Sequence, residues 1–391
     1  MKRFFSFIAL GLLIASLETP TATAVQKVVK RPLTPTISSI SIAGPDRVVI
    51  KYRIDTRYKR YISRIQYSID KGKTWRLSKS TSITLTKLSA DTAYTFTLRQ
   101  RTTSGRYSQV SRRFITSPVI PNFIVQKLLW ADEFNNQESL DPSKWTARYC
   151  GHDAANGGGT CHNNESQYFL PSAISLADGK NAIINTTRIT TRPNEGTCLG
   201  WDCEFISGRF DTQGKVSFQY GYIETRMKMP AGEGNWPAFW MLGTDVTEVG
   251  WPVSGEMDIA EQGGNLPNRN SAALHYSNTQ SGCCSNHIYE TGEVFASAPL
   301  YEDFHTYGLA WTPNQMTLYM DRVPFWSINS VSVTTPFWPG NKPYFLIYDN
   351  AIGPKGGGFG GLWGNWLTSQ TLIDYVRVYA LDGFGEVIYA E

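Results

Sequence analysis

Three carboxylates lie close together in an otherwise apolar segment, Glu256-Met257-Asp258-Ile259-Ala260-Glu261. Hydrolysis of a glycosidic bond needs two neighbouring carboxylates with unequal proton affinities, because one donates a proton while the other is ionised. The same pattern also fits an acidic strand face that is open to water. The residues around the segment are therefore needed to distinguish a glycosidase site from a solvent-exposed acidic strand.

Strand geometry predicts how these side chains are placed. Side chains alternate between faces, so Glu256 and Asp258 share one face, and Met257 and Ile259 point into apolar packing. In a regular strand Glu261 lies on the wrong face, and one extra residue, a β-bulge, returns it to the other two. The Cα atoms of Glu256 and Glu261 are then ~13 Å apart. Two Glu side chains that lean together can bring their carboxyl groups to the ~5–5.5 Å typical of retaining glycosidases.

Tryptophans precede the carboxylates at short spacing. Trp236 and Trp240 lie in Gly234-Asn235-Trp236-Pro237-Ala238-Phe239-Trp240, and Trp251 lies five residues before Glu256. Aromatic faces stack on the apolar C–H faces of sugar rings, so this arrangement favours a sugar-binding cleft. The alternative is that these tryptophans fill a core. The chain is rich in aromatic residues, with 12 Trp and 20 Tyr.

An ordered series of further segments runs from Leu129 to the C-terminus. The segments are 130–135 (WADEFN), 163–168 (NNESQY), 207–210 (SGRF), 220–226 (YGYIETR), 234–240, 255–261, 304–307 (FHTY) with Trp311, and 373–379 (IDYVRVY). This series resembles glycoside hydrolase family 16. The spacing that requires a bulge resembles the laminarinases, agarases and carrageenases, whereas a spacing one residue shorter belongs to the lichenase and xyloglucan-enzyme side.

The resemblance implies a fold, an activity and catalytic roles. The fold would be a concanavalin-like β-jelly-roll sandwich with its cleft on the concave face. The activity would be a secreted, retaining endo-β-1,3-glucanase that cleaves internal linkages of laminarin-like β-glucans by double displacement. Glu256 matches the nucleophile, Glu261 the general acid and base, and Asp258 the carboxylate that assists the nucleophile.

The resemblance also implies substrate contacts. Trp236, Trp240 and Trp251 match aromatic residues of the cleft. Arg226 and Asn164 match positions that contact sugar hydroxyls, and His275 resembles a histidine near the acid. A hydrogen-bonded core histidine is the alternative for His275. No cofactor is expected for catalysis.

The family often binds one structural calcium on the convex face. The matching oxygen ligands here are the carboxylate of Glu133 and backbone oxygens near Gly179 and Asp374, which suit a hard cation. The alternative is that Glu133 and Asp374 are surface carboxylates.

The chain departs from the laminarinase pattern at 348–353 (YDNAIG), where an Asn-Leu-Ala-Val-Gly-Gly-like run is usual. The glycine-rich run 356–361 follows and predicts a loop at the cleft rim that carries aromatics, with Trp363 and Trp366 behind it. This departure leaves two alternatives open on the same fold, a galactan hydrolase of the agarase or carrageenase kind and a transglycosylase. A non-catalytic β-glucan-binding protein is a third, but such a protein would be expected to lose one of the three carboxylates.

The N-terminal residues predict export. Lys2 and Arg3 precede an apolar run, Phe4 to Leu17, and Ala22-Thr23-Ala24 offers a cleavage site, so residues 1–24 resemble a signal peptide. No later run is apolar for long enough to span a membrane. Six cysteines agree with disulfides in a secreted chain. The local pairs 150–161 and 198–203 are expected, and the pairing of Cys283 and Cys284 stays open.

A smaller immunoglobulin-like β-sandwich is expected over residues 25–118, before a catalytic domain at 119–391. Ile65, Tyr67 and Ile69 alternate with polar residues, and Tyr94 resembles the corner tyrosine of fibronectin type III modules. Residues 25–118 hold 20 Lys and Arg against 4 Asp and no Glu, a formal charge of +16, whereas residues 119–391 carry −13.

This charge division predicts partners. The basic module could hold the enzyme near an anionic cell-wall or surface polymer by long-range attraction, and the alternative is a spacer that is basic for solubility. The acidic catalytic part favours a neutral polysaccharide substrate, such as a β-glucan, over a sulfated galactan. Neither nucleic acid nor a membrane is expected as a partner, and the chain is expected to be a monomer.

Overall fold

The computed structural model describes residues 34–54, 56–149, 163–194, 203–279, 286–333, 337–357 and 359–390. Regular structure in these ranges is almost entirely β-strand, which confirms the predicted all-β class. The short helical elements are α1 (Val246–Val249) and the 3-10 turns η1 (Thr56–Tyr61), η3 (Pro171–Ala173) and η4 (Pro339–Asn341). No helix in the described ranges is both long and apolar enough to cross a membrane.

Some predictions concern residues outside these ranges. The signal peptide at 1–24 and five of the six cysteines, Cys150, Cys161, Cys198, Cys283 and Cys284, lie outside the described residues. Cys203 is described and is not a free thiol. The two cysteine pairings therefore stay predictions.

The N-terminal unit is built from two antiparallel sheets. One contains β1 (Thr36–Gly44), β2 (Arg47–Arg53) and β5 (Ser82–Leu85), in that order. The other has the order β4 (Arg76–Leu77), β3 (Ile62–Ser68), β6 (Ala93–Thr102) and β7 (Tyr107–Ile115). Phe96 and Leu98 of the second sheet pack with Val48 and Ile50 of the first in one buried cluster. Alternation along each strand therefore gives this unit a core of its own.

The C-terminal unit contains a ten-stranded sheet within the described residues. Its order is β10 (Gln167–Phe169), β13 (Phe205–Ser207), β12 (Ala182–Arg188), β25 (Thr368–Leu381), β16 (Gly221–Lys228), β21 (His305–Thr312), β22 (Gln315–Met320) and β23 (Val323–Asn329). Two further strands, β11 (Ile174–Ser175) and β8 (Val125–Asp132), pair with β12 and β25.

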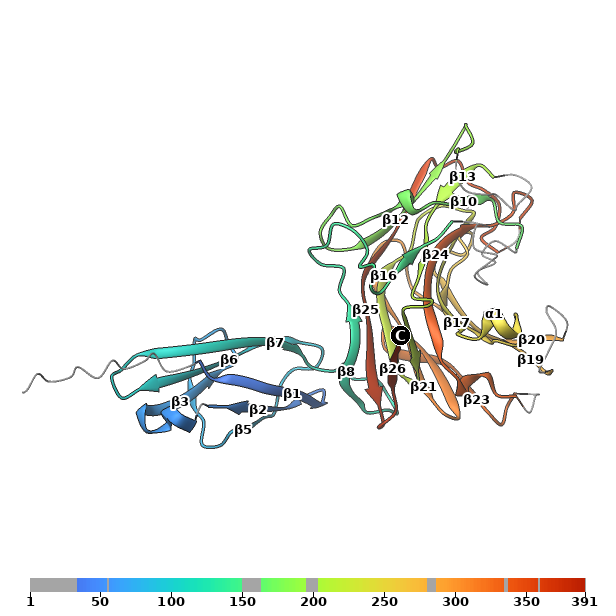
Figure 1. Ribbon diagram of the computed structural model, residues 1–391. Helices are drawn as coiled ribbons and strands as arrows, with labels where there is room; N and C mark the ends of the chain where they lie inside the picture. Colours follow the sequence, from blue (N-terminus) through green and yellow to red (C-terminus); the bar gives the residue numbers. More distant parts are fainter. Residues whose placement is uncertain are drawn as a thin grey trace, which may run out of the picture.

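A nine-stranded sheet, again counted over the described ranges, packs against the first. Its order is β20 (His287–Phe295), β19 (Arg269–Ser277), β18 (Glu256–Glu261), β17 (Asn235–Gly243), β24 (Tyr344–Ile352), β14 (Arg209–Asp211) and β9 (Thr146–Ala147). β15 (Val216–Gln219) pairs with β24 and with β26 (Glu386–Tyr389). Figure 1 shows the two sheets as successive layers, with β25 and β16 in one and β24 and β17 in the next. The predicted β-sandwich is present.

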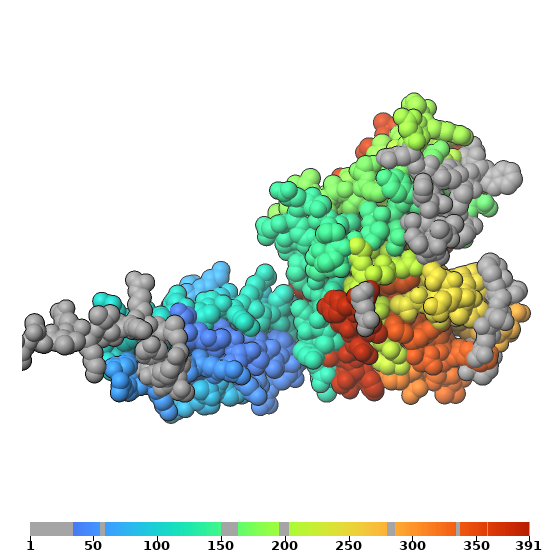
Figure 2. All heavy atoms as spheres, viewed as in Figure 1, coloured from blue at the N-terminus to red at the C-terminus, as the bar shows by residue number. Residues whose placement is uncertain are grey.

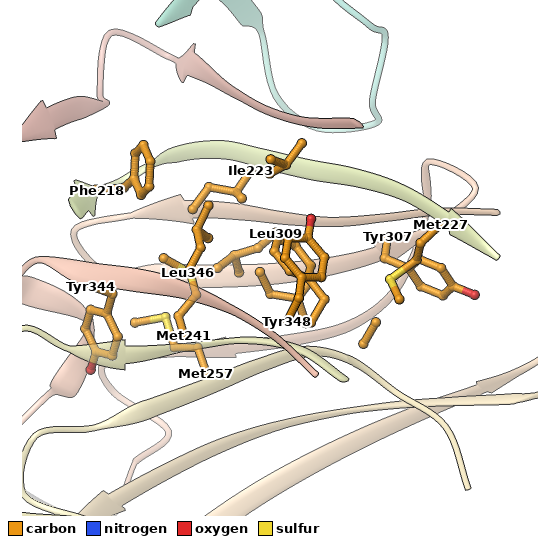
Figure 3. Close-up of a cluster of buried hydrophobic side chains, with 14 of the residues drawn as sticks. Phe218, Ile223, Met227, Met241, Met257, Tyr307, Leu309, Tyr344, Leu346 and Tyr348 are labelled. Atoms are coloured by element: carbon orange, nitrogen blue, oxygen red, sulfur yellow. The ribbon is translucent and has the colours of Figure 1, made fainter. Parts of the chain in front are cut away.

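The main core lies between these two sheets. Ile223 and Met227 of the ten-stranded sheet meet Met241, Met257 and Leu346 of the nine-stranded sheet (Figure 3). A buried hydrogen bond also joins the layers, from the Tyr348 hydroxyl to Oγ1 of Thr225 at 2.7 Å. Because the inner face of the nine-stranded sheet is used for packing, its outer face is the one left to carry a site.

The two units contact each other through strands and ion pairs. β1 lies against β8, and the Asp91 carboxylate of the N-terminal unit receives hydrogen bonds from Arg322 at 2.7 Å and Arg377 at 3.2 Å. Figure 2 shows the N-terminal residues, in blue, as a lobe beside the C-terminal unit.

Candidate active site

The three carboxylates of β18 lie on one face because the strand is bulged. Opposite β17, Asp258 pairs with Trp240 and Ala260 pairs with Phe239, so Ile259 is the extra residue. The register against β19 is irregular over the same stretch. Glu256, Asp258 and Glu261 all line one cleft, while Met257 and Ile259 are buried in the core. The bulge that the spacing predicts is therefore present, and it has the predicted effect.

The backbone at Gly255, just before β18, lies close to the Tyr344 side chain. Gly255 has a φ of +75°, and a Cβ at this position would lie 2.0 Å from the Tyr344 hydroxyl. Only glycine fits both the left-handed conformation and this contact. The turn that delivers Glu256 to the cleft therefore depends on Gly255.

The cleft has a volume of about 1140 Å³ and lies on the outer face of the nine-stranded sheet. Small-molecule pockets usually measure about 300–1,000 Å³, so this cleft is large enough for an extended ligand. Apart from the three carboxylates, the residues of the predicted site that line it are Trp236, Trp240, Trp251 and His275.

Each tryptophan of the cleft donates a hydrogen bond to a carboxylate. Nε1 of Trp236 donates to Oε1 of Glu261 at 2.8 Å, and Nε1 of Trp251 donates to Oε2 of Glu256 at 3.0 Å. Trp240 donates to Oδ2 of Asp349 at 3.2 Å. These rings are therefore fixed by polar contacts and do not merely fill a core, which was the alternative interpretation.

His275 lies beside the carboxylates and is part of an aromatic stack. Its Nε2 is 3.2 Å from Oδ2 of Asp258 and 3.8 Å from Oε1 of Glu256. Its Nδ1 is 2.8 Å from Nε2 of His287, and the two imidazole rings stack with Tyr289. Sequence reasoning missed His287 and Tyr289. The available signal is the period of two along β20, because His287, Tyr289, Thr291 and Glu293 share one face.

Burial raises the pKa of each of Glu256, Asp258 and Glu261 to about 8. The charge of Asp258 adds to this effect for the two glutamates, and the charge of Asp349 adds to it for Asp258. Such close carboxylates share protons and titrate as a cluster. At neutral pH the cluster therefore retains protons, so it can supply both an acid and, once ionised, a nucleophile or base.

Donors around the cluster stabilise the ionised form of both glutamates. His275 and the Trp251 indole lower the pKa of Glu256 against burial, and the Trp236 indole and His275 lower that of Glu261. Oδ2 of Asp258 is buried and forms no hydrogen bond, and Nε2 of His275 lies 3.2 Å from it. Burial and the charge of Asp349 favour the neutral form of Asp258.

Sequence reasoning also missed a second charged group in the cleft. Asp349 lies 3.6 Å from Nη1 of Arg209, whose guanidinium lies 4.9 Å from the centre of the Trp240 ring. Burial raises the pKa of Asp349 to about 6 and that of nearby Glu165 to about 7. Asp349 falls in the run where the chain departs from the laminarinase pattern, and that departure was the available signal.

Comparisons with known proteins agree with this geometry. Residues 176–354 match the family described as glycosyl hydrolases family 16. A β-glucanase of Rhodothermus marinus is 33% identical over 263 residues, which cover 65% of this chain and 85% of that protein. The chain belongs to glycosyl hydrolase family 16.

Two further relatives show how much of the chain is shared. A glucan endo-1,3-β-glucosidase A1 of Niallia circulans is 31% identical over 68% of this chain, but the match spans only 39% of that longer protein. The endo-β-1,3-glucanase structure of Pyrococcus furiosus is 31% identical, with a TM-score of 0.57, over 67% of this chain and 97% of that one. The jelly-roll sandwich expected for a family 16 glycoside hydrolase is thus confirmed.

Arg226, in contrast, is not brought to the cleft. Along β16, Ile223 and Met227 face the core between the sheets, so Arg226 points to the other side of the ten-stranded sheet. There its Nη1 is 2.6 Å from Oδ2 of Asp374, and its guanidinium lies over Phe304. This placement corrects the expectation that Arg226 contacts a substrate in the cleft.

Two further segments reach the cleft, but not through Asn164, Trp363 or Trp366, the residues that the sequence suggested. Asn164 is exposed with a φ of +56°, and its neighbours Asn163 and Glu165 line the cleft instead. Phe359 of the glycine-rich run lies at the cleft, 4.8 Å from the Trp236 ring. Trp363 and Trp366 do not line it, and both pack on Phe205.

The predicted calcium ligands are already engaged with other groups. The Glu133 carboxylate receives two hydrogen bonds from Arg377, at 2.7 and 2.8 Å. The Gly179 carbonyl accepts from the amide of Asn136 at 3.1 Å, whereas Asp374 is ion-paired with Arg226 through its side chain and not through the predicted backbone oxygen. Because a guanidinium already neutralises Glu133, this set does not fit a calcium site. We assign no metal here.

Proposed function

We propose that this family 16 enzyme is an endo-β-1,3-glucanase that acts on laminarin-like glucans with retention of configuration. The bulged β18, which holds Glu256, Asp258 and Glu261 in one cleft, is the observation that carries the proposal. The Niallia circulans and Pyrococcus furiosus proteins are named for action on β-1,3-glucans, which supports the β-1,3 linkage proposed here. The volume of the cleft supports binding of several sugar units, as cleavage inside a polymer requires.

The reaction follows from the placement of the glutamates. Ionised Glu256 attacks the anomeric carbon while Glu261 gives its proton to the departing glycosidic oxygen, so a glycosyl-enzyme ester forms as the glycosidic bond breaks. Glu261, now ionised, takes a proton from water, and the hydroxide oxygen displaces Glu256 from the same carbon. Two inversions retain the configuration of the sugar.

The contacts make both protonation states accessible to each glutamate. Burial and the charge of Asp258, when it is ionised, raise the pKa of Glu256 and of Glu261, while His275 and one indole, Trp251 or Trp236, lower it. The division of roles between the two glutamates is the one that the family resemblance implies. A neutral Asp258 can share its proton with an ionised neighbour. The separation of ~5–5.5 Å between the two carboxyl groups stays a prediction.

An assay against laminarin, lichenan, agarose and carrageenan, with product analysis, tests the proposal. Internal cleavage of laminarin to β-configured oligosaccharides is expected, and Glu256→Gln should abolish it. Glu293→Gln is the matched control, because Glu293 lines the same cleft outside the cluster. Full activity of Glu256→Gln would refute the assignment of Glu256 as the nucleophile. Preferential cleavage of agarose or carrageenan would favour the galactan hydrolase alternative.

We also propose that the N-terminal unit is a fibronectin type III-like module. Its division into three and four strands supports this, as does Tyr94 at the start of β6, whose hydroxyl accepts a hydrogen bond from the Ser89 amide at 2.9 Å. A tyrosine corner makes this kind of bond to the backbone. Cooperative unfolding of an isolated 25–118 fragment would support an independent module, and a fragment without β structure would contradict it.

Export of the enzyme is a proposal as well, and the basic, apolar and small-residue regions of 1–24 support it. N-terminal sequencing of protein recovered from the culture medium should then begin at Val25. Retention of the full chain inside the cell would contradict export.

A further inference from the structure

The outer face of the four-stranded sheet in the N-terminal unit carries arginines that no carboxylate neutralises. On β6, Phe96 and Leu98 face the core, so Arg99 and Arg101 face outward. Arg64 of β3 lies directly opposite Arg101. Among the described residues, no ion pair joins any of these three arginines to Asp or Glu.

The three described aspartates of this unit are placed elsewhere. Asp46 lies in the turn between β1 and β2 of the other sheet, and Asp91 is bound to Arg322 and Arg377 of the catalytic unit. Asp70 accepts hydrogen bonds from Ser68 and Thr74, which hold its pKa well below the usual range. The positive charge of this face is therefore not balanced within its own unit.

Like charges directly opposite each other on a sheet face destabilise it. Arg64 and Arg101 form such a pair on the face away from the core, where Arg64 is exposed and Arg101 is half-buried. An anionic ligand that lies across the two strands would remove this repulsion. The pair thus gives a physical reason for the face to bind an anion.

Aromatic rings hold part of this face in one arrangement. The Arg99 guanidinium lies 3.5 Å from the centre of the Trp75 ring and 4.7 Å from that of Tyr107. Its Nε and Nη2 donate to Oε1 of Gln66 at 3.2 and 3.0 Å. Tyr107, which lies opposite Arg101, is 52% exposed. The face therefore offers one fixed guanidinium group, that of Arg99, beside an accessible aromatic ring.

We propose that this face, made by Arg64, Gln66, Trp75, Arg99, Arg101 and Tyr107, binds an acidic polysaccharide. Planar guanidinium groups pair with carboxylate and sulfate groups, and Tyr107 supplies an apolar surface for sugar rings. The charge of +16 on residues 25–118 attracts such a polymer over a distance, while the −13 of residues 119–391 keeps it out of the catalytic cleft. The bound polymer is thus an anchor, chemically distinct from the neutral glucan that is cleaved.

Two charge-matched double variants of the full-length protein test the site. Arg64→Gln with Arg101→Gln removes two charges from the face, and Lys51→Gln with Arg53→Gln removes two exposed charges from β2 of the opposite sheet. Binding is measured by affinity electrophoresis in gels that contain polygalacturonate, with neutral dextran gels as the blank. Low ionic strength is used because salt screens these interactions.

The first double variant should bind polygalacturonate about tenfold more weakly, since two charge contacts are lost. The second should stay close to the parent protein, and both should hydrolyse laminarin as the parent does. An equal loss of polygalacturonate binding in the two double variants would overturn the site, because it would mean that the polymer is attracted by the overall charge of the unit and not by this face. Absence of retardation would overturn it too, as would tighter binding of duplex DNA or of phosphatidylserine vesicles through the same residues. Laminarin hydrolysis is scored separately, so failure of this anchor leaves the catalytic proposal standing.

Discussion

The indole Nε1 of Trp236 donates a hydrogen bond to Oε1 of Glu261 at 2.8 Å, and this bond connects a cleft aromatic to the proposed catalytic acid. The bond stabilises the ionised carboxylate, so it lowers the pKa of Glu261, whereas burial and the charge of Asp258 raise it. Burial is the largest of these effects, and the acid therefore keeps its proton to higher pH than an exposed glutamate does.

Replacing Trp236 by Phe should move the alkaline limb of the pH profile of kcat/KM to higher pH. The variant lacks the donor that favours ionised Glu261, so the pKa of this carboxyl rises and the acid stays protonated further into the alkaline range. The measurement is kcat/KM on laminarin as a function of pH. Trp363→Phe is the control, because Trp363 does not line the cleft and its indole donates to the Gly353 carbonyl. An alkaline limb that moves to lower pH in Trp236→Phe would contradict the assignment of Glu261 as the acid.

Asp349→Asn should move the same limb in the opposite direction. The charge of Asp349 raises the pKa of both Asp258 and Glu261, so its removal lowers both, and the acid loses its proton at lower pH. Asn retains an oxygen that can accept the hydrogen bond from Trp240. Asp211→Asn serves for comparison, since Asp211 lines the same cleft but is paired with Arg148. Equal shifts in both variants would mean that Asp349 has no particular effect on the acid.

Glu261→Gln should reduce kcat/KM on laminarin by about 10²–10⁴, the usual contribution of general acid–base catalysis. The loss should be smaller for an oligosaccharide with a dinitrophenolate leaving group, because this anion departs without a proton. Steady-state kinetics on both substrates provide the comparison. Equal losses on the two would argue that Glu261 binds the substrate and does not protonate it.

Asp91→Asn should loosen the contact between the two units without changing catalysis. Asp91 accepts from Arg322 and Arg377, and both arginines keep a second acidic partner, Glu224 or Glu133. The Asp91 side chain is partly exposed, so the expected cost is no more than about 1 kcal/mol. Small-angle scattering should show a larger radius of gyration. Asp46→Asn, at an exposed position of the same unit, should leave the radius of gyration unchanged. Equal scattering curves for the parent and the two variants would show that Asp91 does not hold the two units together.

Local pattern was enough to predict the strand that carries the three carboxylates. Period-two alternation puts Glu256 and Asp258 on one face, and the odd spacing to Glu261 demands the bulge that Ile259 forms. Apolar residues such as Met257 predict which face is buried. These inferences succeed because they depend on covalent spacing within a single strand, which long-range packing does not change.

Long-range packing decided which other residues reach the carboxylates. Alternation along β16 cannot say whether Arg226 faces the cleft or the far side of the other sheet, and the structure places it on the far side, beside Asp374. His287 and Asp349 come to the cleft from β20 and β24, strands that lie beside it only because of the sheet order. Residue spacing and composition alone therefore predict that Glu256, Asp258 and Glu261 share one face and that the two units carry opposite charges. Which distant side chains surround these carboxylates and shift their pKa values depends on strand order and on the face that each sheet buries, and both are properties of the folded chain.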